Sequence, residues 1–272
     1  MHITAIQPLI AAAHDPQWHS PEHFARRIDL LDRLEDALLE QPDSAELHTA
    51  IATLEHANRT LYRRLREAIA QGREREALLP WAAPATDNTP TYDYRDALLS
   101  GVLDLPEPGD NIGALEPEMV HYQPTPARRI FDLLDLCRLQ ANDVLVDLGS
   151  GLGHVPLLTA ICTGARSVGI EREPAYVHSA HQAAVALKLE HANFVCQDLR
   201  DSDLSEGTVF YLYTPVMGGL LRELLDRLEA EAKRRSIRIC SLGPCTHVLA
   251  QAPWLRVAYP PHEHRIALFK GG

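Results

Sequence analysis

The sequence predicts an α/β protein in which a parallel sheet follows a pair of amphipathic helices. The strongest indication is an apolar, β-branched run at 144–147, followed by a glycine-rich turn and an apolar helix. Further β-type runs alternate with helical patterns up to residue 242, an order typical of parallel sheets. Before residue 80, apolar residues recur at steps of three and four, which predicts two helices.

The first 80 residues are predicted to form a helical hairpin. Residues 1–19 contain two prolines and are expected to be an irregular arm. Ser20 is the predicted N-cap of the first helix, which runs to about Glu40. Asp43 and Glu46 have the spacing of a capping box, and the second helix is expected to end near Gly72.

Residues 81–121 are predicted to connect this hairpin to a third region. The stretch 79–90 is rich in Pro, Ala and Thr, which is typical of a linker. A short helix is expected at 93–100, because Gly101 follows it. Residues 104–122 show no periodicity, and long loops of this kind are usually functional. We therefore expect a lid that leads into a cofactor-binding domain at 122–272.

The turn after the 144–147 strand carries Gly149, Ser150, Gly151 and Gly153. Glycines permit positive φ and let backbone N–H groups approach a ligand. Their spacing differs from the G-x-G-x-x-G pattern of dinucleotide-binding proteins. The carboxylate of Asp147 just before the turn would repel a pyrophosphate and attract an ammonium group. This arrangement favours S-adenosylmethionine, which has a cationic amino-acid end, over NAD.

Three successive predicted strands end at an acidic residue. Asp147 closes the first strand, Glu171 follows the run 167–170, and Asp198 follows the run 193–197. In an open parallel sheet, ligands bind beyond the carboxyl ends of the strands. The three carboxylates are therefore predicted to lie at one binding edge.

The stretches DLGSGLGH, GIE, CQDL and FYLYTP resemble the class I S-adenosylmethionine-dependent methyltransferases over roughly 122–272. Within that class, VDLGSGLGHV preceded by YQPTPARRIFDLL is similar to the non-SET, Dot-type histone lysine methyltransferases and their bacterial relatives. This resemblance implies a seven-stranded Rossmann-like sheet of order 3-2-1-4-5-7-6. The segments 254–259 and 264–269 would then form its terminal antiparallel pair.

The resemblance also implies roles for individual residues in cofactor binding. Asp147 would face the methionine amino group, and Glu171 would bind the ribose hydroxyls. Asp198 would meet the adenine amino group, with Leu199 beside the ring. The methionine portion would rest on the glycine turn, formed by Gly149, Ser150, Gly151 and Gly153.

Two tyrosines are candidates for the wall of the methyl-transfer channel. Tyr122 precedes the helix that feeds the first strand, in a stretch that ends at Thr125. Tyr213 follows the fourth strand and stands where many relatives have an Asn- or Asp-Pro-Pro-aromatic turn. This chain has neither the amide nor the carboxylate there, so that mechanism does not carry over. We expect Tyr122 and Tyr213 to be catalytic, and Thr125 and Tyr213 to contact the cofactor.

The amino-acid composition limits the kinds of partner and ligand that this protein is expected to bind. A net charge of −11 argues against nucleic acid, whose binding depends on neutralising phosphates. The five cysteines include no C-x-x-C pair, which predicts reduced thiols and a cytoplasmic protein. No stretch is long and apolar enough to span a membrane. The fourteen histidines show no closed ligand set, so no metal is expected.

Several alternatives stay open at this stage. The methyl acceptor is unidentified, and a protein lysine, another amine or a hydroxyl-bearing metabolite all fit. The chain could also be an inert methyltransferase-fold protein that binds partners through its hairpin, or an NAD-type oxidoreductase. The hairpin could join two copies into a homodimer, because two isolated amphipathic helices bury their apolar faces poorly.

Overall fold

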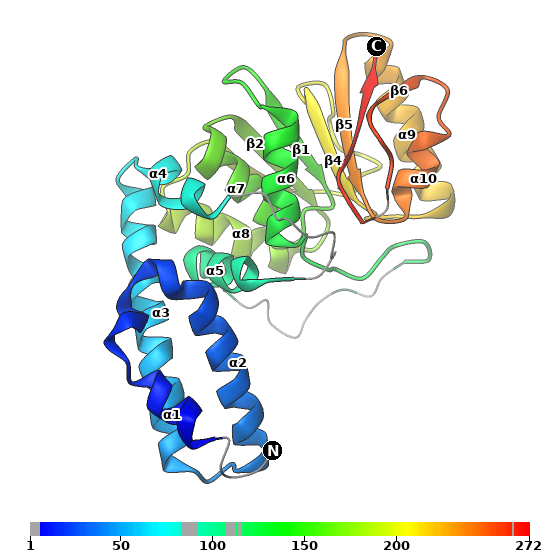
Figure 1. Ribbon diagram of the computed structural model, residues 1–272. Helices are drawn as coiled ribbons and strands as arrows, with labels where there is room; N and C mark the ends of the chain where they lie inside the picture. The colour runs from blue at the N-terminus through cyan, green and yellow to red at the C-terminus, as the bar shows by residue number, and fades with distance from the viewer. Residues whose placement is uncertain (1–5, 83–91, 107–112, 114–115, 263) are drawn as a thin grey trace.

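The computed structural model describes residues 6–82, 92–106, 113, 116–262 and 264–272. Two long helices extend away from a sheet that is flanked by helices (Figure 1). The sheet has seven strands in the order β3-β2-β1-β4-β5-β7-β6, which confirms the predicted order. The strands are β1 (Val144–Leu148), β2 (Arg166–Glu171), β3 (Ala192–Cys196), β4 (Val209–Tyr213), β5 (Ile237–Leu242), β6 (Leu255–Tyr259) and β7 (Ala267–Gly271).

The first five strands are parallel, and β7 runs antiparallel to both β5 and β6. Alternate residues of the central strand β4 enter two different hydrophobic clusters: Val209 and Tyr211 face one side, whereas Phe210 and Leu212 face the other. Both faces are therefore covered, as a buried parallel sheet requires.

Helices from different parts of the chain cover the two faces. On the first face lie α6 (Ala127–Cys137), α7 (His154–Thr163) and α8 (Pro174–Ala186). The other face is covered by α9 (Gly218–Ala232) and α10 (Cys245–Ala250). Helices alternating with the strands were predicted, whereas the short α10 was not.

Residues 6–70 contain three α-helices, so the expectation of an irregular arm at 1–19 is wrong in part. Residues Gln7–Ala13 form α1, which packs against α2 (Phe24–Glu40) and α3 (Ala45–Ala70). The residues Pro21–His23, which were expected to begin the first helix, form a 3-10 turn instead. The N-cap of α3 is Ser44, whose hydroxyl accepts the Leu47 N–H, rather than Asp43.

Helix α1 covers the apolar face of the helical hairpin. Ile6, Leu9 and Ile10 join a buried cluster with residues of α2 and α3, including Leu34 and Leu54, which are fully buried. The apolar faces of the hairpin are thus shielded within one chain. Pairing with a second copy stays a prediction that this packing does not require.

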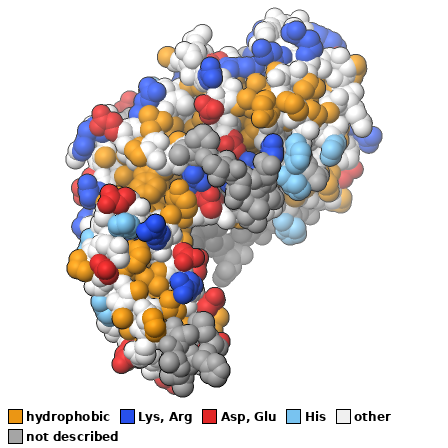
Figure 2. All heavy atoms as spheres, in the orientation of Figure 1, with side chains coloured by type: hydrophobic (Ala, Val, Ile, Leu, Met, Phe, Trp, Pro, Cys, Tyr) orange, Lys and Arg blue, Asp and Glu red, His pale blue; other side chains and the backbone are white. Residues whose placement is uncertain are grey.

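Two arginines of α3 form ion pairs within the chain. Arg59 lies 3.1 Å from Glu55, and Arg66 lies 2.6 Å from Asp104, the first residue of the predicted lid. Figure 2 shows acidic and basic side chains interspersed over the helical part rather than gathered in one patch. The charged side chains of the helical part therefore form a mixed, solvent-facing surface. None of the helices in the described residues is long and apolar enough to cross a membrane.

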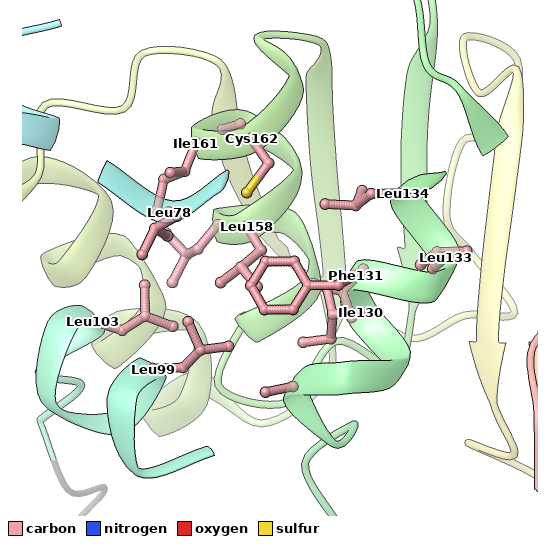
Figure 3. Packing of buried hydrophobic residues seen from close by; sticks show 14 of the residues in the cluster. Leu78, Leu99, Leu103, Ile130, Phe131, Leu133, Leu134, Leu158, Ile161 and Cys162 are labelled. Atoms are coloured by element: carbon pink, nitrogen blue, oxygen red, sulfur yellow. The ribbon is translucent and has the colours of Figure 1, made fainter. Parts of the chain in front are cut away.

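The hydrophobic core continues across the boundary predicted at residue 80. The short helix α4 (Glu74–Leu78) places the fully buried Leu78 beside Leu158 and Ile161 of α7 (Figure 3). Helix α5 (Tyr94–Leu103), predicted as a shorter helix, adds Leu99 and Leu103 to the same cluster. The division into a hairpin, a linker and a cofactor domain stays a prediction, but one cluster joins its first and last parts.

Candidate functional site

A cavity of about 560 Å³ lies at the carboxyl ends of the parallel strands. Its walls come from the ends of β1, β2 and β4, from the segment after β3, and from residues 119–125. Most of the predicted lid before this segment, at 107–112 and 114–115, lies outside the described residues. The predicted residues that line the cavity are Tyr122, Thr125, Asp147, Gly149, Ser150, Glu171, Asp198, Leu199 and Tyr213.

The glycine turn needs glycine for both conformation and space. Gly149 has φ +86°, and a Cβ there would lie 2.5 Å from the Cβ of Pro215. Gly151 has φ +51°, and its Cβ would lie 2.0 Å from the ring of Tyr122. The turn is thus pressed against the segments after β4 and before α6. Gly151 and Gly153 do not line the cavity; Gly153 packs against Phe194.

The Glu171 carboxylate ties two parts of the site together. Its Oε2 accepts the Gly151 N–H at 2.8 Å, and its Oε1 accepts the Glu173 N–H at 2.8 Å. The first bond fixes the glycine turn after β1, and the second fixes the start of α8. Each carboxylate oxygen has a second lone-pair direction. Glu171 can therefore hold the turn and still accept ligand hydroxyls.

Asp147 is a buried acid in the wall of the cavity. The residue is 4% exposed, and its neighbour in the sheet is Tyr211 of β4. Burial, and secondly the nearby Glu171, raise the pKa of Asp147 well above its ordinary value of 3.8. A buried carboxyl with a raised pKa is stabilised as a carboxylate when a cation binds beside it. The site is thus suited to a ligand with a positive charge.

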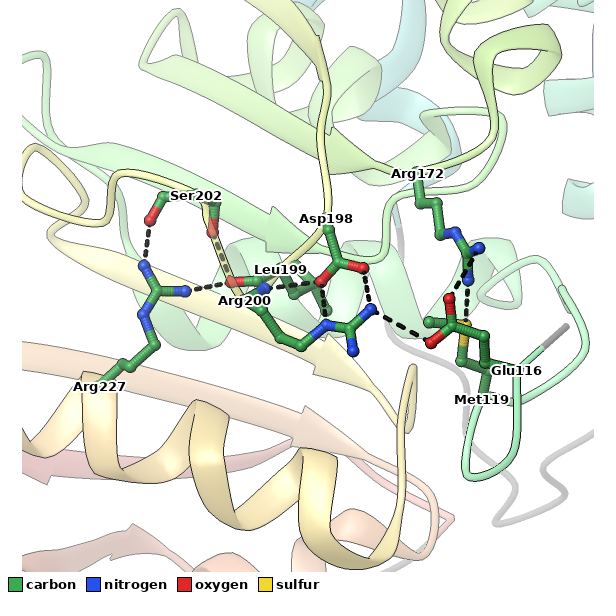
Figure 4. A network of polar contacts seen from close by, with 8 residues as sticks. All are labelled: Glu116, Met119, Arg172, Asp198, Leu199, Arg200, Ser202 and Arg227. Carbon is green, nitrogen blue, oxygen red and sulfur yellow. Dashed lines mark hydrogen bonds and ion pairs between the residues drawn. The ribbon is translucent and has the colours of Figure 1, made fainter.

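Asp198 takes part in a network of polar contacts, three of whose members, Asp198, Arg200 and Arg172, line the cavity (Figure 4). Its Oδ1 accepts the backbone N–H of Arg200 at 2.8 Å and the Nε–H at 2.9 Å, and its Oδ2 lies 2.7 Å from Nη2. Arg200 also reaches Glu116 at 3.2 Å, and Glu116 pairs with Arg172 at 3.0 Å. These contacts leave lone-pair capacity on Oδ2 alone, where an amino group could still donate.

The ring of Tyr122 lies over the glycine turn. Its hydroxyl lies 3.3 Å from Nδ1 of His154, and its ring centroid lies 5.1 Å from that of Tyr176. Burial lowers the pKa of His154 to about 4, so its imidazole is neutral at pH 7. A neutral ring next to a tyrosine hydroxyl can orient that hydroxyl but is a weak base for removing its proton.

The structure adds a site residue that the sequence did not reveal. The fully buried Tyr211 lines the cavity, and its hydroxyl lies 3.0 Å from Oγ1 of Thr125. This contact holds the segment before α6 against β4. The available signal was the two-residue spacing between Tyr211 and Tyr213, which places both side chains on one face of the strand. The Thr125 hydroxyl is thus hydrogen-bonded to Tyr211, and Thr125 also lines the cavity.

The turn after β4 is held in place by hydrogen bonds to the neighbouring segments. Thr214 has φ +43°, and its hydroxyl donates to the Leu242 carbonyl at 3.1 Å and accepts the Cys245 N–H at 3.2 Å. The Val120 N–H donates to the Pro215 carbonyl at 3.2 Å. The neighbouring Tyr213 is half-buried, and its side chain lines the cavity. The chain thus keeps a rigid turn here without the amide or carboxylate of the related motif.

Metal binding has no support in the part of the chain that the structure describes. No group of three or more His, Cys, Asp or Glu side chains there could hold a metal ion. The rings of His262 and His264 are tilted relative to one another with centroids 5.6 Å apart, and the backbone N–H of His264 donates to Nδ1 of His262.

The strand order, the antiparallel β7 and the glycine turn after β1 define a class I S-adenosylmethionine-dependent methyltransferase fold. The model of the family described as "Histone methylation protein DOT1" matches residues 121–241. This match confirms the predicted resemblance to the Dot-type enzymes over the segment that contains the cavity. Among curated proteins, none matches the chain.

Several solved structures are similar to part of the chain. An RNA methyltransferase from Salinibacter ruber, in complex with S-adenosyl-L-homocysteine, is 28% identical, with a TM-score of 0.44 over 55% of this chain and 92% of that one. A human methyltransferase 10 domain containing protein is 15% identical, with a TM-score of 0.42 over 65% of this chain and 93% of that one. The strand order itself, rather than these likenesses, assigns the fold.

Proposed function

We propose that this chain is a methyltransferase that uses S-adenosylmethionine and binds it in the cavity at the carboxyl ends of β1, β2 and β4. The observation that carries the proposal is the buried Asp147 carboxyl in the wall of this cavity, with a raised pKa that a cationic ligand would offset. A cavity of about 560 Å³ falls in the range of roughly 300–1,000 Å³ usual for cofactor sites.

The residues present fit the chemistry of this cofactor. Asp147 would hold the ammonium group, Glu171 the ribose hydroxyls, and Asp198 the adenine amino group through Oδ2. Bound there, S-adenosylmethionine supplies a methyl group whose bond to sulfur breaks as a bond to the acceptor forms, with the electron pair left on sulfur. Tyr122 and Tyr213 would exclude water and orient the acceptor, since positioning contributes most to such a displacement.

A nucleotide panel tests the proposal. S-adenosylhomocysteine should raise the melting temperature of the full chain, whereas NAD should not, because the pyrophosphate would meet the Asp147 carboxylate. A shift with NAD alone would indicate the oxidoreductase alternative. No shift with either nucleotide would indicate an inert fold that acts through its helical part.

A cytoplasmic location stays a prediction from the free cysteines.

Cofactor binding should be coupled to proton release at Asp147. In the free chain its pKa is raised, so a fraction of molecules is protonated as the pH falls toward that raised value. Binding an ammonium group favours the carboxylate, so the affinity should increase as the pH rises through the raised pKa. Calorimetry in buffers of different ionisation heats should detect between zero and one proton released per S-adenosylhomocysteine bound.

Two controls isolate Asp147 as the source of this proton. Methylthioadenosine lacks the ammonium group, and its affinity should not vary with pH for this reason. In Asp147→Asn the release should vanish, and the affinity should fall about tenfold for the loss of one ion pair of about 1.4 kcal/mol. Equal proton release in Asp147→Asn would assign the coupling to another group.

The tyrosine hydroxyls should matter for turnover more than for cofactor binding. Tyr122→Phe and Tyr213→Phe remove the hydroxyls of two residues that line the cavity. In the proposed site these hydroxyls would stand between the cofactor and the acceptor. With acceptor pools and labelled S-adenosylmethionine, kcat should fall about tenfold in each variant, the effect of one hydrogen bond in the transition state. The affinity for S-adenosylhomocysteine should stay within about twofold. Wild-type kcat in both variants would exclude a role for the hydroxyls.

A further inference from the structure

A second cavity of about 430 Å³ adjoins the first on the β5 side of the sheet. The two cavities share five lining residues: Val120, His121, Gln123, Tyr213 and Thr214. The end of β5, the start of α6 and Met217 close the second cavity on its other sides. Tyr213 thus stands between a proposed cofactor site and a space of small-molecule size.

The two cavities differ in charge. The first is lined by five acids, namely Asp147, Glu171, Glu173, Asp198 and Glu223, against three arginines, Arg172, Arg200 and Arg227. Among the described residues that line the second, none is an aspartate or a glutamate. Its charged and polar side chains are Arg129, His121, His264 and Gln123, together with the hydroxyls of Tyr213 and Thr214.

Arg129 brings a permanent positive charge to this cavity. The residue is 5% exposed and lies in the first turns of α6. Its Nη1 pairs with Asp132 at 2.8 Å, which holds the guanidinium in place; Asp132 itself does not line the cavity. His121 and His264 are exposed at the mouth, beside the apolar Val120 and Met217.

The hydrogen-bonding groups of the second cavity indicate which class of methyl acceptor it can bind. An ammonium group brings three donors and no acceptor, and it would meet a guanidinium but no carboxylate. A carboxylate or phosphate only accepts, and it makes strong charge-assisted bonds with guanidinium and imidazole N–H groups. The cavity is therefore complementary to an oxyanion and not to a lysine side chain of a basic peptide.

We propose that the second cavity binds a small methyl acceptor that carries a carboxylate or phosphate group, held by Arg129, His121 and His264. This inference rests on the proposed function, because it assigns the acceptor of that reaction. The apolar rim and Tyr213 would hold the rest of the molecule, with its reacting atom turned past Tyr213 toward the first cavity. The chain's net charge of −11 repels a polyanionic nucleic acid more strongly than a small anion.

Probes with one ring and different charged groups test this assignment. The full chain, with and without saturating S-adenosylhomocysteine, is titrated by calorimetry with benzoate, phenyl phosphate and benzylamine. The oxyanion probes should bind at least tenfold more tightly than benzylamine. His121→Ala and His264→Ala should each weaken oxyanion binding about tenfold through loss of a charge-assisted bond, and Arg129→Lys should also weaken it. His181→Ala, an exposed histidine of α8 outside both cavities, should change nothing.

The outcomes separate this inference from the proposed function. Absence of S-adenosylhomocysteine binding would overturn the proposed function, while oxyanion binding in the second cavity would still be measured on the free chain with the two histidine variants. With S-adenosylhomocysteine filling the acidic first cavity, benzylamine or a lysine-rich peptide binding as tightly as benzoate and phenyl phosphate would overturn the inference. So would oxyanion binding that is unchanged in both histidine variants, which are at exposed positions and should fold normally.

Discussion

Glu171→Gln is expected to weaken S-adenosylhomocysteine binding about 10- to 100-fold. The carboxylate accepts backbone N–H groups from the glycine turn and from the start of α8, each at 2.8 Å. In the proposed site it would also accept the ribose hydroxyls, and one hydrogen bond to a charged group contributes about 1.5–3 kcal/mol. Glutamine keeps the size of the side chain but removes the charge and replaces one acceptor by a donor. Calorimetry on the purified variant measures the change.

The control for this variant is Glu190→Gln. Glu190 is an exposed acid beyond the end of α8 and does not line the cavity, so its replacement should leave the affinity unchanged. Melting curves without ligand show whether Glu171→Gln also loosens the glycine turn. An unchanged affinity in Glu171→Gln would remove Glu171 from the ribose site.

The sheet was predictable because its central strands β1, β4 and β5 are buried apolar runs and because the family resemblance implies the strand order. The errors lie where local signals are ambiguous. The prolines of residues 1–19 predict irregular structure, but Pro8 lies in the first turn of α1, where its missing N–H removes no hydrogen bond of the helix. Helix α10 has six residues, too few to show a helical period.

The acids of the site were predictable because strand ends meet at one edge of a parallel sheet. Contacts between distant residues were not. Arg200 and Glu116 are separated by 84 positions, and nothing in the sequence pairs them. Tyr211 reads as a strand residue, and only the fold brings its hydroxyl to Thr125. The second cavity likewise forms only where the segment before α6, the turn after β4 and the end of β5 meet in the fold.

The dependence of the cofactor domain on the N-terminal helices gives a prediction with a large effect on stability. Leu78→Ala should lower the free energy of unfolding by about 2–5 kcal/mol, the usual range for truncating a buried leucine. Leu78 is fully buried beside Leu158 and Ile161 of α7, the helix that begins at the glycine turn. Denaturant unfolding followed by circular dichroism measures the loss.

Leu39→Ala on α2 provides the matched control for Leu78→Ala. Leu39 is 83% exposed, so its truncation leaves no cavity and should change stability by no more than about 0.5 kcal/mol. If the helices before residue 80 folded independently of the sheet, Leu78→Ala would leave the cofactor domain as stable as the wild type. Because Leu78 packs on α7, we expect S-adenosylhomocysteine binding to be lost at lower denaturant concentration in Leu78→Ala than in Leu39→Ala. Coincident loss of binding in the two variants would show that α4 does not support the cofactor site.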